Sequence, residues 1–234
     1  MLTNLLLPAL LLLAGVDASP VELDERQQAP CQSVQVFIAR GSTEPYPGRQ
    51  GALANAICRN NPSCGYQDIV YPATFENYCS SVQAGVVSGA ALITAYAARC
   101  PNSKLVLTGY SQGAHLVGDI LGGGGGNLGS CTQATSSGLN PATSPGNKIA
   151  AALLFGDVRH TANQAYNTAT GASRNGNWPR SGAQLASLNR FSSVLRSWCL
   201  VGDPACAGGT DPNAHTSYFN VFTNEAAAWV QTKL

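Results

Sequence analysis

Residues 109–113 read Gly-Tyr-Ser-Gln-Gly and place Ser111 between two glycines in the pattern G-x-S-x-G. The apolar, β-rich run 104–108 precedes this motif, and apolar residues at helical spacing follow it from Gln112. In a strand, turn and helix of this kind, small glycines let the helix pack close to the strand while the serine hydroxyl projects from a sharp turn. The pattern therefore predicts Ser111 as a nucleophile. The alternative is a surface serine in an ordinary loop.

A serine hydroxyl is a weak nucleophile, so it needs a histidine that accepts its proton and an acidic group that orients the histidine. His215 is expected in a loop before the last helix, and Asp203 lies twelve positions earlier, after the apolar segment 191–201. We expect His215 to be the base and Asp203 the acid, in the chain order Ser, Asp, His.

The other two histidines offer alternatives. Asp157 and His160 follow an apolar run and form a second candidate acid and base, although supporting or lining the rim of the site is the simpler interpretation. His115 lies four residues after Ser111, which on a helix places it one turn below the serine. We therefore do not expect His115 to be the base.

The charge that develops on a carbonyl oxygen during attack needs two hydrogen-bond donors. The backbone N–H of Gln112, directly after the nucleophile, is expected to be one of them. The second is expected from the polar turn at residues 40–43, where Ser42 offers both an N–H and a hydroxyl. An ordinary turn serine is the alternative interpretation of Ser42.

The composition fits a single domain. The chain has 234 residues, of which 44% are hydrophobic and 11% charged, so it can bury a substantial core. A formal net charge of +1 without a basic cluster argues against nucleic-acid binding. The three histidines are scattered without metal-ligand spacing, so we expect neither a metal nor a cofactor.

The N-terminus predicts secretion. Residues 1–14 form an uncharged apolar stretch that is followed by small residues around Ala18 and Ser19, which is typical of a signal peptide, expected here at 1–18. Residues 19–30 are expected to be a pro-segment or flexible N-terminus, and 31–234 the catalytic domain. The alternative of a membrane anchor is disfavoured because the apolar stretch is too short and no other run approaches about 20 residues. We expect a secreted protein that does not bind membranes and is monomeric.

Eight cysteines behind a signal peptide indicate disulfides formed in an oxidising compartment. Cys58 with Cys64 and Cys199 with Cys206 are close enough in sequence to close single loops. Longer closures remain for Cys31, Cys79, Cys100 and Cys131, among which we favour Cys31 with Cys100, although spacing alone does not fix the connectivity.

Strand-like and helix-like segments alternate along the chain. Strands are expected at 34–39, 67–71, 104–108 and 149–155 and within 191–201, and helices at 51–58, 80–99, from Gln112 to the glycine run, and at 219–233. The glycine run 122–126 and the stretch 161–180 are expected to be loops, the second long enough to shape the rim of the site. The alternation predicts an α/β fold with a central parallel sheet flanked by helices on both faces, whose ligand groups gather at the carboxyl ends of the strands.

With these residues identified, the chain resembles the fungal cutinase and acetylxylan esterase family of secreted serine esterases over about residues 31–234. The resemblance rests on Cys31 followed by Val-Phe-Ile-Ala-Arg-Gly-Ser-Thr-Glu at 36–44, on Cys100-Pro followed by the serine motif, and on Cys199-x-x-Gly-Asp-Pro-x-Cys206 followed by His215. It implies a small lidless α/β-hydrolase with a Ser111, Asp203 and His215 triad. It also implies an oxyanion hole of Ser42 and Gln112, and the bridges Cys31 to Cys100 and Cys199 to Cys206.

The substrate prediction follows from one loop. The resemblance implies that cutinases carry bulky aliphatic residues in the loop between the bridge corresponding to Cys199–Cys206 and the histidine. Here that loop, residues 207–214, reads Ala-Gly-Gly-Thr-Asp-Pro-Asn-Ala. Burying a methylene is worth about 0.8 kcal/mol, so this loop gains little from a long acyl chain. We expect removal of acetyl from plant xylan, with hydrolysis of cutin as the alternative and an inert secreted binding protein as another. Five rings are candidates for stacking on sugar, although such rings more often simply pack in the fold: Tyr46, Tyr71, Phe75, Tyr78 and Trp178.

Overall fold

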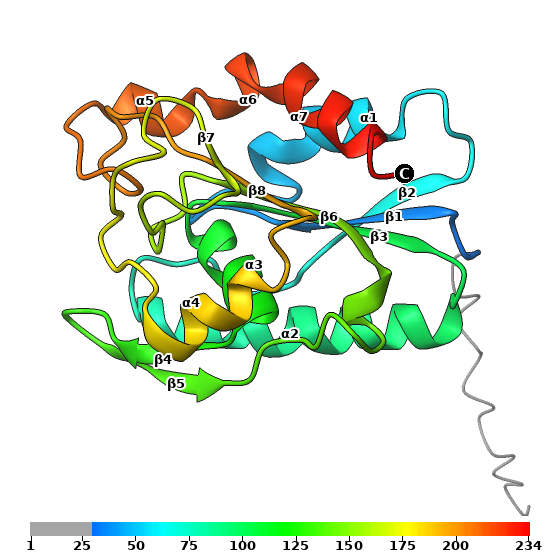
Figure 1. Cartoon of the computed structure of the whole chain (residues 1–234), viewed down its shortest axis with the longest axis horizontal. Coiled ribbons are helices and arrows are strands. Elements are labelled where there is room, and N and C mark those ends of the chain that lie inside the picture. Colours follow the sequence, from blue (N-terminus) through cyan, green and yellow to red (C-terminus); the bar gives the residue numbers. More distant parts are fainter. Residues whose placement is uncertain (1–29) are drawn as a thin grey trace, which may run out of the picture. The chain divides into compact units, whose positions relative to one another are not determined.

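Six parallel strands form the central sheet, in the order β2-β1-β3-β6-β8-β7 (Figure 1). The computed structural model describes residues 30–234, and the expected signal peptide and pro-segment, apart from Pro30, lie outside the described residues. The strands are β1 (Val34–Ala39), β2 (Cys64–Asp68), β3 (Lys104–Tyr110), β6 (Ile149–Phe155), β7 (Asn167–Thr168) and β8 (Leu195–Trp198). All six residues of β1 are buried, as continuous apolar strands covered on both faces should be.

Helices cover both faces of this sheet (Figure 1). On one face lie α1 (Gly51–Cys58) and α7 (Thr223–Gln231), which pack against each other, and on the other α2 (Tyr78–Arg99), α3 (Gln112–Gly122) and α4 (Gly182–Asn189). Each face has its own hydrophobic cluster, one containing Leu116 and Ile120 of α3 and the other Leu53 and Ile57 of α1. The expected α/β architecture is confirmed.

The helix α2 is 22 residues long and, among the described residues, apolar enough by length and composition to cross a membrane. Nine of its residues are buried, and its side chains Val82, Val86 and Ile93 belong to the core cluster shared with α3. Its apolar composition is therefore explained by packing inside the domain.

The structure corrects the expected loop at the glycine run. Gly124–Asn127 forms β4, which pairs with β5 (Thr132–Ser136) in an antiparallel hairpin. Gly125 and Gly126 adopt φ of 110° and 112°, a region that glycine enters readily, so the hairpin uses these residues for their backbone freedom. Glycine is otherwise depleted in strands, which is why the sequence pattern pointed to a loop.

Two further boundaries differ from expectation. The second strand lies at Cys64–Asp68 rather than 67–71, although the N–H of Ile69 still donates to the carbonyl of Ile38. The last helical segment is divided into α6 (Tyr218–Val221) and α7, which meet at Phe222. A short helix, α5 (Pro212–Thr216), precedes them and carries His215.

Four disulfides link the eight cysteines in the part of the chain that is described. Cys31–Cys100 is the long closure favoured from the sequence, and Cys58–Cys64 and Cys199–Cys206 are the two short loops. The remaining bridge, Cys79–Cys131, joins the start of α2 to the segment just before β5.

Candidate active site

Ser111 lies at the turn between β3 and α3 with φ 55° and ψ −118°, a conformation that non-glycine residues rarely adopt. The two glycines of the motif permit this turn because they let backbone segments lie closer together than a side chain would allow. A Cβ on Gly109 would lie 2.3 Å from the carbonyl oxygen of Gly113, and one on Gly113 would lie 1.9 Å from that of Ala39. The backbone strain at the serine is thus held by tight packing of α3 against β1 and β3.

His215, in α5, lies within hydrogen-bonding distance of Ser111. Its Nε2 lies 2.9 Å from Ser111 Oγ, and its Nδ1 lies 2.8 Å from Asp203 Oδ2. The helix α5 that carries it is capped by Asp211, whose side chain accepts from the N–H of Asn213. The three residues expected from sequence to act together therefore lie in one hydrogen-bonded chain.

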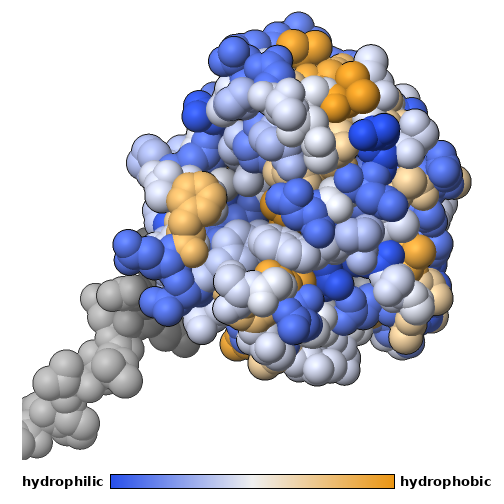
Figure 2. Space-filling view, turned by 90° about the vertical axis from the view of Figure 1, so that its left-hand side faces the viewer, coloured by the Kyte–Doolittle hydropathy of each residue, from blue (hydrophilic) through white to orange (hydrophobic). Residues whose placement is uncertain are grey.

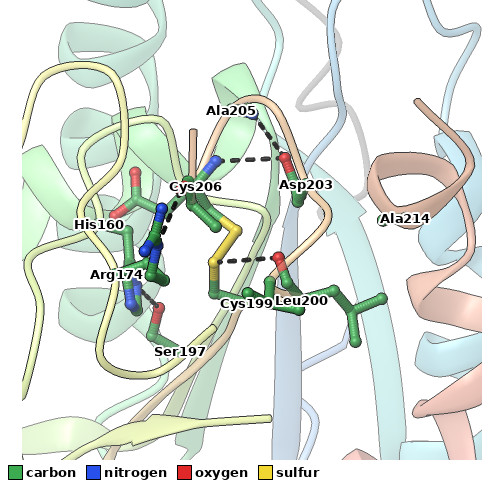
Figure 3. The surroundings of a disulfide bond; sticks show 12 residues. His160, Arg174, Ser197, Cys199, Leu200, Asp203, Ala205, Cys206 and Ala214 are labelled. Atoms are coloured by element: carbon green, nitrogen blue, oxygen red, sulfur yellow. Dashed lines mark hydrogen bonds between the residues drawn. A yellow bond between two sulfur atoms is a disulfide. The ribbon is translucent and has the colours of Figure 1, made fainter. Parts of the chain in front are cut away.

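Asp203 is buried in the loop closed by the Cys199–Cys206 bridge (Figure 3). Its Oδ1 accepts from the N–H groups of Ala205 at 2.6 Å and Cys206 at 3.2 Å. Burial opposes ionisation of Asp203, but the hydrogen bond and charge of His215, together with hydrogen bonds from Tyr218 and Ala205, hold the pKa of Asp203 below its ordinary value of 3.8. The carboxylate is therefore held charged and oriented toward the histidine.

Two tyrosines donate hydrogen bonds to Asp203 and His215, and neither was predicted from the sequence. The hydroxyl of Tyr218 donates to Asp203 Oδ2 at 2.6 Å, and that of Tyr110 donates to the carbonyl of His215 at 2.9 Å. Burial raises the pKa of Tyr110 to about 12, and burial together with the charge of Asp203 raises that of Tyr218, so both remain donors. Tyr218 follows His215 by three residues, a spacing that places both on one side of a helical turn.

Gly156 is a third feature that the sequence analysis missed. It follows β6 with φ 59°, and a Cβ there would lie 2.9 Å from His215 Cε1. The glycine leaves room for the imidazole. The available signal was a glycine directly after a buried strand.

The expected oxyanion donors lie beside Ser111. The Gln112 side chain accepts from Ser81 Oγ at 3.0 Å and donates to the carbonyl of Thr74 at 2.9 Å, which fixes the start of α3. Its backbone N–H is at the first turn of the helix, where no partner within the helix exists. Ser42 lines the same cavity as Ser111, and its Oγ is buried without a hydrogen-bond partner among the described residues.

The alternative residues do not reach Ser111 Oγ. Asp157 pairs with Arg180 at 2.6 Å, and His160 Nδ1 lies 3.1 Å from Ser197 Oγ. His115 is buried in α3 with Nε2 3.1 Å from Asp119 Oδ2. These side chains belong to a buried polar cluster behind the serine rather than to its rim.

A cavity of about 630 Å³ opens beside Ser111 and His215. Its lining comes from the loop after β1, from Phe75 and Tyr110, and from Thr216, and none of it comes from 161–180. The expectation that this stretch forms the rim was wrong. At the end of this stretch the Arg180 guanidinium is buried inside the domain instead of facing the cavity, because it pairs with Asp157 and, at 3.1 Å, with Asp119.

The surface on the side of α5 is mainly hydrophilic. Figure 2 views the molecule from the left of Figure 1, where α5 lies, and its hydrophobic residues form separate areas rather than one continuous band. Within residues 30–234 there is no group of three histidine, cysteine or acidic side chains placed to hold a metal ion.

The sequence matches the cutinase family over residues 30–234. The chain belongs to the cutinase family. It is 29% identical to acetylxylan esterase 2 of Talaromyces purpureogenus, with 95% of this chain and 96% of that protein covered. It is 32% identical to Cutinase 11 of Verticillium dahliae, with 97% of this chain and 76% of that protein covered.

A solved structure supports the same assignment. The catalytic core domain of acetyl xylan esterase from Trichoderma reesei is 30% identical, with a TM-score of 0.78, and the match covers 88% of this chain and 100% of that one. The predicted α/β-hydrolase fold and the predicted family are confirmed, and the chain is a carboxylic ester hydrolase.

Proposed function

We propose that this family member is a secreted serine esterase that removes acetyl groups from plant xylan, using Ser111, His215 and Asp203 as its triad. The observation that carries the proposal is the hydrogen-bonded chain from Ser111 Oγ through His215 to Asp203, at 2.9 and 2.8 Å, beside a cavity with polar and aromatic walls. No metal or cofactor enters the mechanism.

In the first half-reaction Ser111 Oγ attacks the ester carbonyl carbon and its proton passes to His215 Nε2. The carbonyl oxygen becomes an oxyanion that accepts hydrogen bonds from the Gln112 N–H and from Ser42. His215 then protonates the sugar oxygen, which leaves, and the acetyl group remains on Ser111. Asp203 keeps the Nδ1 proton of His215 in place and stabilises the imidazolium.

In the second half-reaction water loses a proton to His215 and attacks the acetyl-serine carbonyl. The oxyanion is stabilised by the same donors, and its collapse breaks the bond to Ser111 Oγ, which regains the proton from His215. Acetate leaves and the site returns to its starting state.

The lining of the cavity favours a short acyl group. Among the described residues that form it there is no Leu, Ile, Val or Met. Each methylene of a long acyl chain contributes about 0.8 kcal/mol only where it is buried against apolar surface. Sequence identity does not decide the substrate, since an acetylxylan esterase and a cutinase match at 29% and 32%. Hydrolysis of cutin therefore remains the second candidate.

Secretion is proposed from two features. Residues 1–18 have the composition of a signal peptide, and four disulfides lie in the described domain. We also propose that the secreted protein is a monomer and needs no protein partner to act on its polymer. Size-exclusion chromatography of the secreted protein tests its oligomeric state.

The test compares acetate released from acetylated xylan with fatty acid released from cutin, with Ser111→Ala as the blank. We expect acetate alone, and a loss of roughly 10⁴-fold or more in the Ser111→Ala protein. Release of fatty acid at a comparable rate would instead establish a cutinase. If a serine-directed organophosphonate fails to label the folded protein, the chain is an inert binding protein.

A further inference from the structure

Two aromatic rings are exposed where the cavity beside Ser111 opens. Tyr46 is 43% exposed and Phe75 is 69% exposed, and both line the cavity. The other three candidate rings lie elsewhere: Tyr71 is buried with its hydroxyl bonded to the carbonyl of Arg40, and Tyr78 packs against Trp178 with ring centroids 5.5 Å apart. Of the five rings expected from sequence, the cavity is lined by these two.

Tyr46 is held rigidly. The Arg40 guanidinium lies 3.9 Å from the centroid of the Tyr46 ring and covers part of one face. The Tyr46 hydroxyl accepts from the N–H of Tyr71 at 3.1 Å and lies 3.3 Å from its carbonyl. A ring fixed in this way loses little conformational entropy when a ligand covers its exposed surface.

Phe75 has the opposite character. Its ring makes no contact with another aromatic ring among the described residues, and most of its surface lies in water. Covering this surface with a ligand removes apolar area from water and is favourable. A large apolar ring left exposed at the mouth of a cavity therefore indicates a ligand contact.

The polar groups around the two rings suit hydroxyls rather than an acyl chain. Glu44 and Arg49 form an ion pair at 3.1 Å on the cavity wall, and the Arg49 side chain is half-exposed. Thr43 and Thr216 line the same space. Flat apolar faces next to charged and hydroxyl groups match a sugar ring, which presents C–H groups on its faces and hydroxyls at its edge.

We propose that Tyr46 and Phe75 form a stacking platform for a pyranose ring of the polysaccharide, on the alcohol side of the ester attacked by Ser111. This inference rests on the proposed esterase function and deepens it. The platform contributes to substrate binding and does not take part in the proton transfers.

The test measures kcat/KM on three esters: an acetylated xylo-oligosaccharide, ethyl acetate and ethyl octanoate. Ethyl acetate offers the same acyl group without a sugar ring. We expect Phe75→Ala to lower kcat/KM on the oligosaccharide roughly three- to tenfold, mainly through KM, and to lower that on ethyl acetate by a clearly smaller factor. Tyr66→Ala is the matched control, because Tyr66 is 47% exposed but does not line the cavity.

Further variants distinguish stacking on a flat ring from simple burial of apolar surface. Phe75→Trp keeps a flat ring and should retain the oligosaccharide activity, whereas Phe75→Leu keeps apolar area without the ring and should lower that activity as Phe75→Ala does. Since Tyr46→Ala removes contacts to Arg40 and Tyr71, its fold is checked by thermal melting. Tyr46→Phe keeps the ring but loses the hydroxyl contacts with Tyr71, and it should bind the oligosaccharide better than Tyr46→Ala.

Three outcomes would overturn the platform. They are an equal loss on the oligosaccharide and ethyl acetate, no loss on either, or a selective loss on ethyl octanoate, which would make Phe75 part of an acyl groove. Activity of the parent on ethyl acetate, abolished in Ser111→Ala, tests the esterase separately, so failure of the platform and failure of the esterase give different results.

Discussion

The hydroxyl of Tyr218 donates a hydrogen bond to Asp203 Oδ2 at 2.6 Å, the same oxygen that faces His215 Nδ1 at 2.8 Å. The N–H of Leu200 donates to this tyrosine oxygen at 3.0 Å. The carboxylate oxygen thus has two donors, one from the candidate base and one from a tyrosine that is completely buried. Tyr218 acts on the site through Asp203 and does not touch the serine.

Tyr218→Phe removes one donor from the charged carboxylate, which is a hydrogen bond worth about 1.5–3 kcal/mol. We expect kcat/KM on ethyl acetate to fall about tenfold. Because a hydrogen bond to the charged form lowers a carboxyl pKa, its loss should raise the pKa of Asp203, which NMR titration of the Asp203 carboxyl carbon measures. Tyr66→Phe, at an exposed position, is the control. A lower rate with an unchanged pKa of Asp203 would assign Tyr218 a purely structural role.

The short disulfides allow a matched comparison. Cys199–Cys206 and Cys58–Cys64 span sequence separations of 7 and 6, so their loops constrain the unfolded chain similarly. Only the first loop holds Asp203, whose Oδ1 accepts from Ala205 and Cys206.

We therefore expect the double serine variants of the two bridges to lose similar thermal stability. Activity at a temperature where both stay folded should fall at least about tenfold in the 199/206 variant, because orientation of the imidazole depends on that carboxylate. The 58/64 variant should retain its activity. Equal activities in the two proteins would contradict this role for the loop.

The sequence pointed to the three residues of the candidate site because their signals are local. A G-x-S-x-G motif after a buried strand predicts a nucleophile, and the order Ser, Asp, His limits its partners. Tyr218 and Gly156 were missed, since their roles arise only when β6, α5 and α6 meet. The stretch 161–180 was predicted to form the rim of the site from its length alone. The ion pairs of Arg180 with the buried Asp157 and Asp119, which hold the end of this stretch inside the domain, leave no local signal in the sequence.

Gly113→Ala tests the close approach behind the serine. The added Cβ would lie 1.9 Å from the carbonyl oxygen of Ala39, and backbone atoms of α3 and β1 would have to move apart. Overpacking of this kind costs about 1–3 kcal/mol or more, and we expect a lower melting temperature together with loss of activity. Gly65→Ala is the control, because its nearest neighbour is Gln32 Cγ at 3.3 Å on a flexible side chain. A Gly113→Ala protein with unchanged melting and activity would refute the packing argument.

The buried cluster behind the serine predicts how stability depends on pH. Asp119 is completely buried, and although burial opposes its ionisation, His115, Arg180 and Arg159 hold its pKa below the ordinary value of 3.8. The pKa of Asp203 is lowered as well. A carboxyl group with a lowered folded pKa contributes stability that is fully present above its unfolded pKa and is lost as the pH falls through the folded value.

The melting temperature should therefore be steady from pH 7 to about 5 and fall steeply below about pH 4. Asp119→Asn leaves Arg159 and Arg180 with one carboxylate fewer and should cost about 3–5 kcal/mol at pH 7, the usual penalty for breaking a buried ion pair. Its melting temperature should also decline less between pH 4 and 2, because one of the two carboxylates whose pKa is lowered is gone. Calorimetry of both proteins across this range measures the difference, and parallel declines would show that Asp119 does not set the acid sensitivity of the fold.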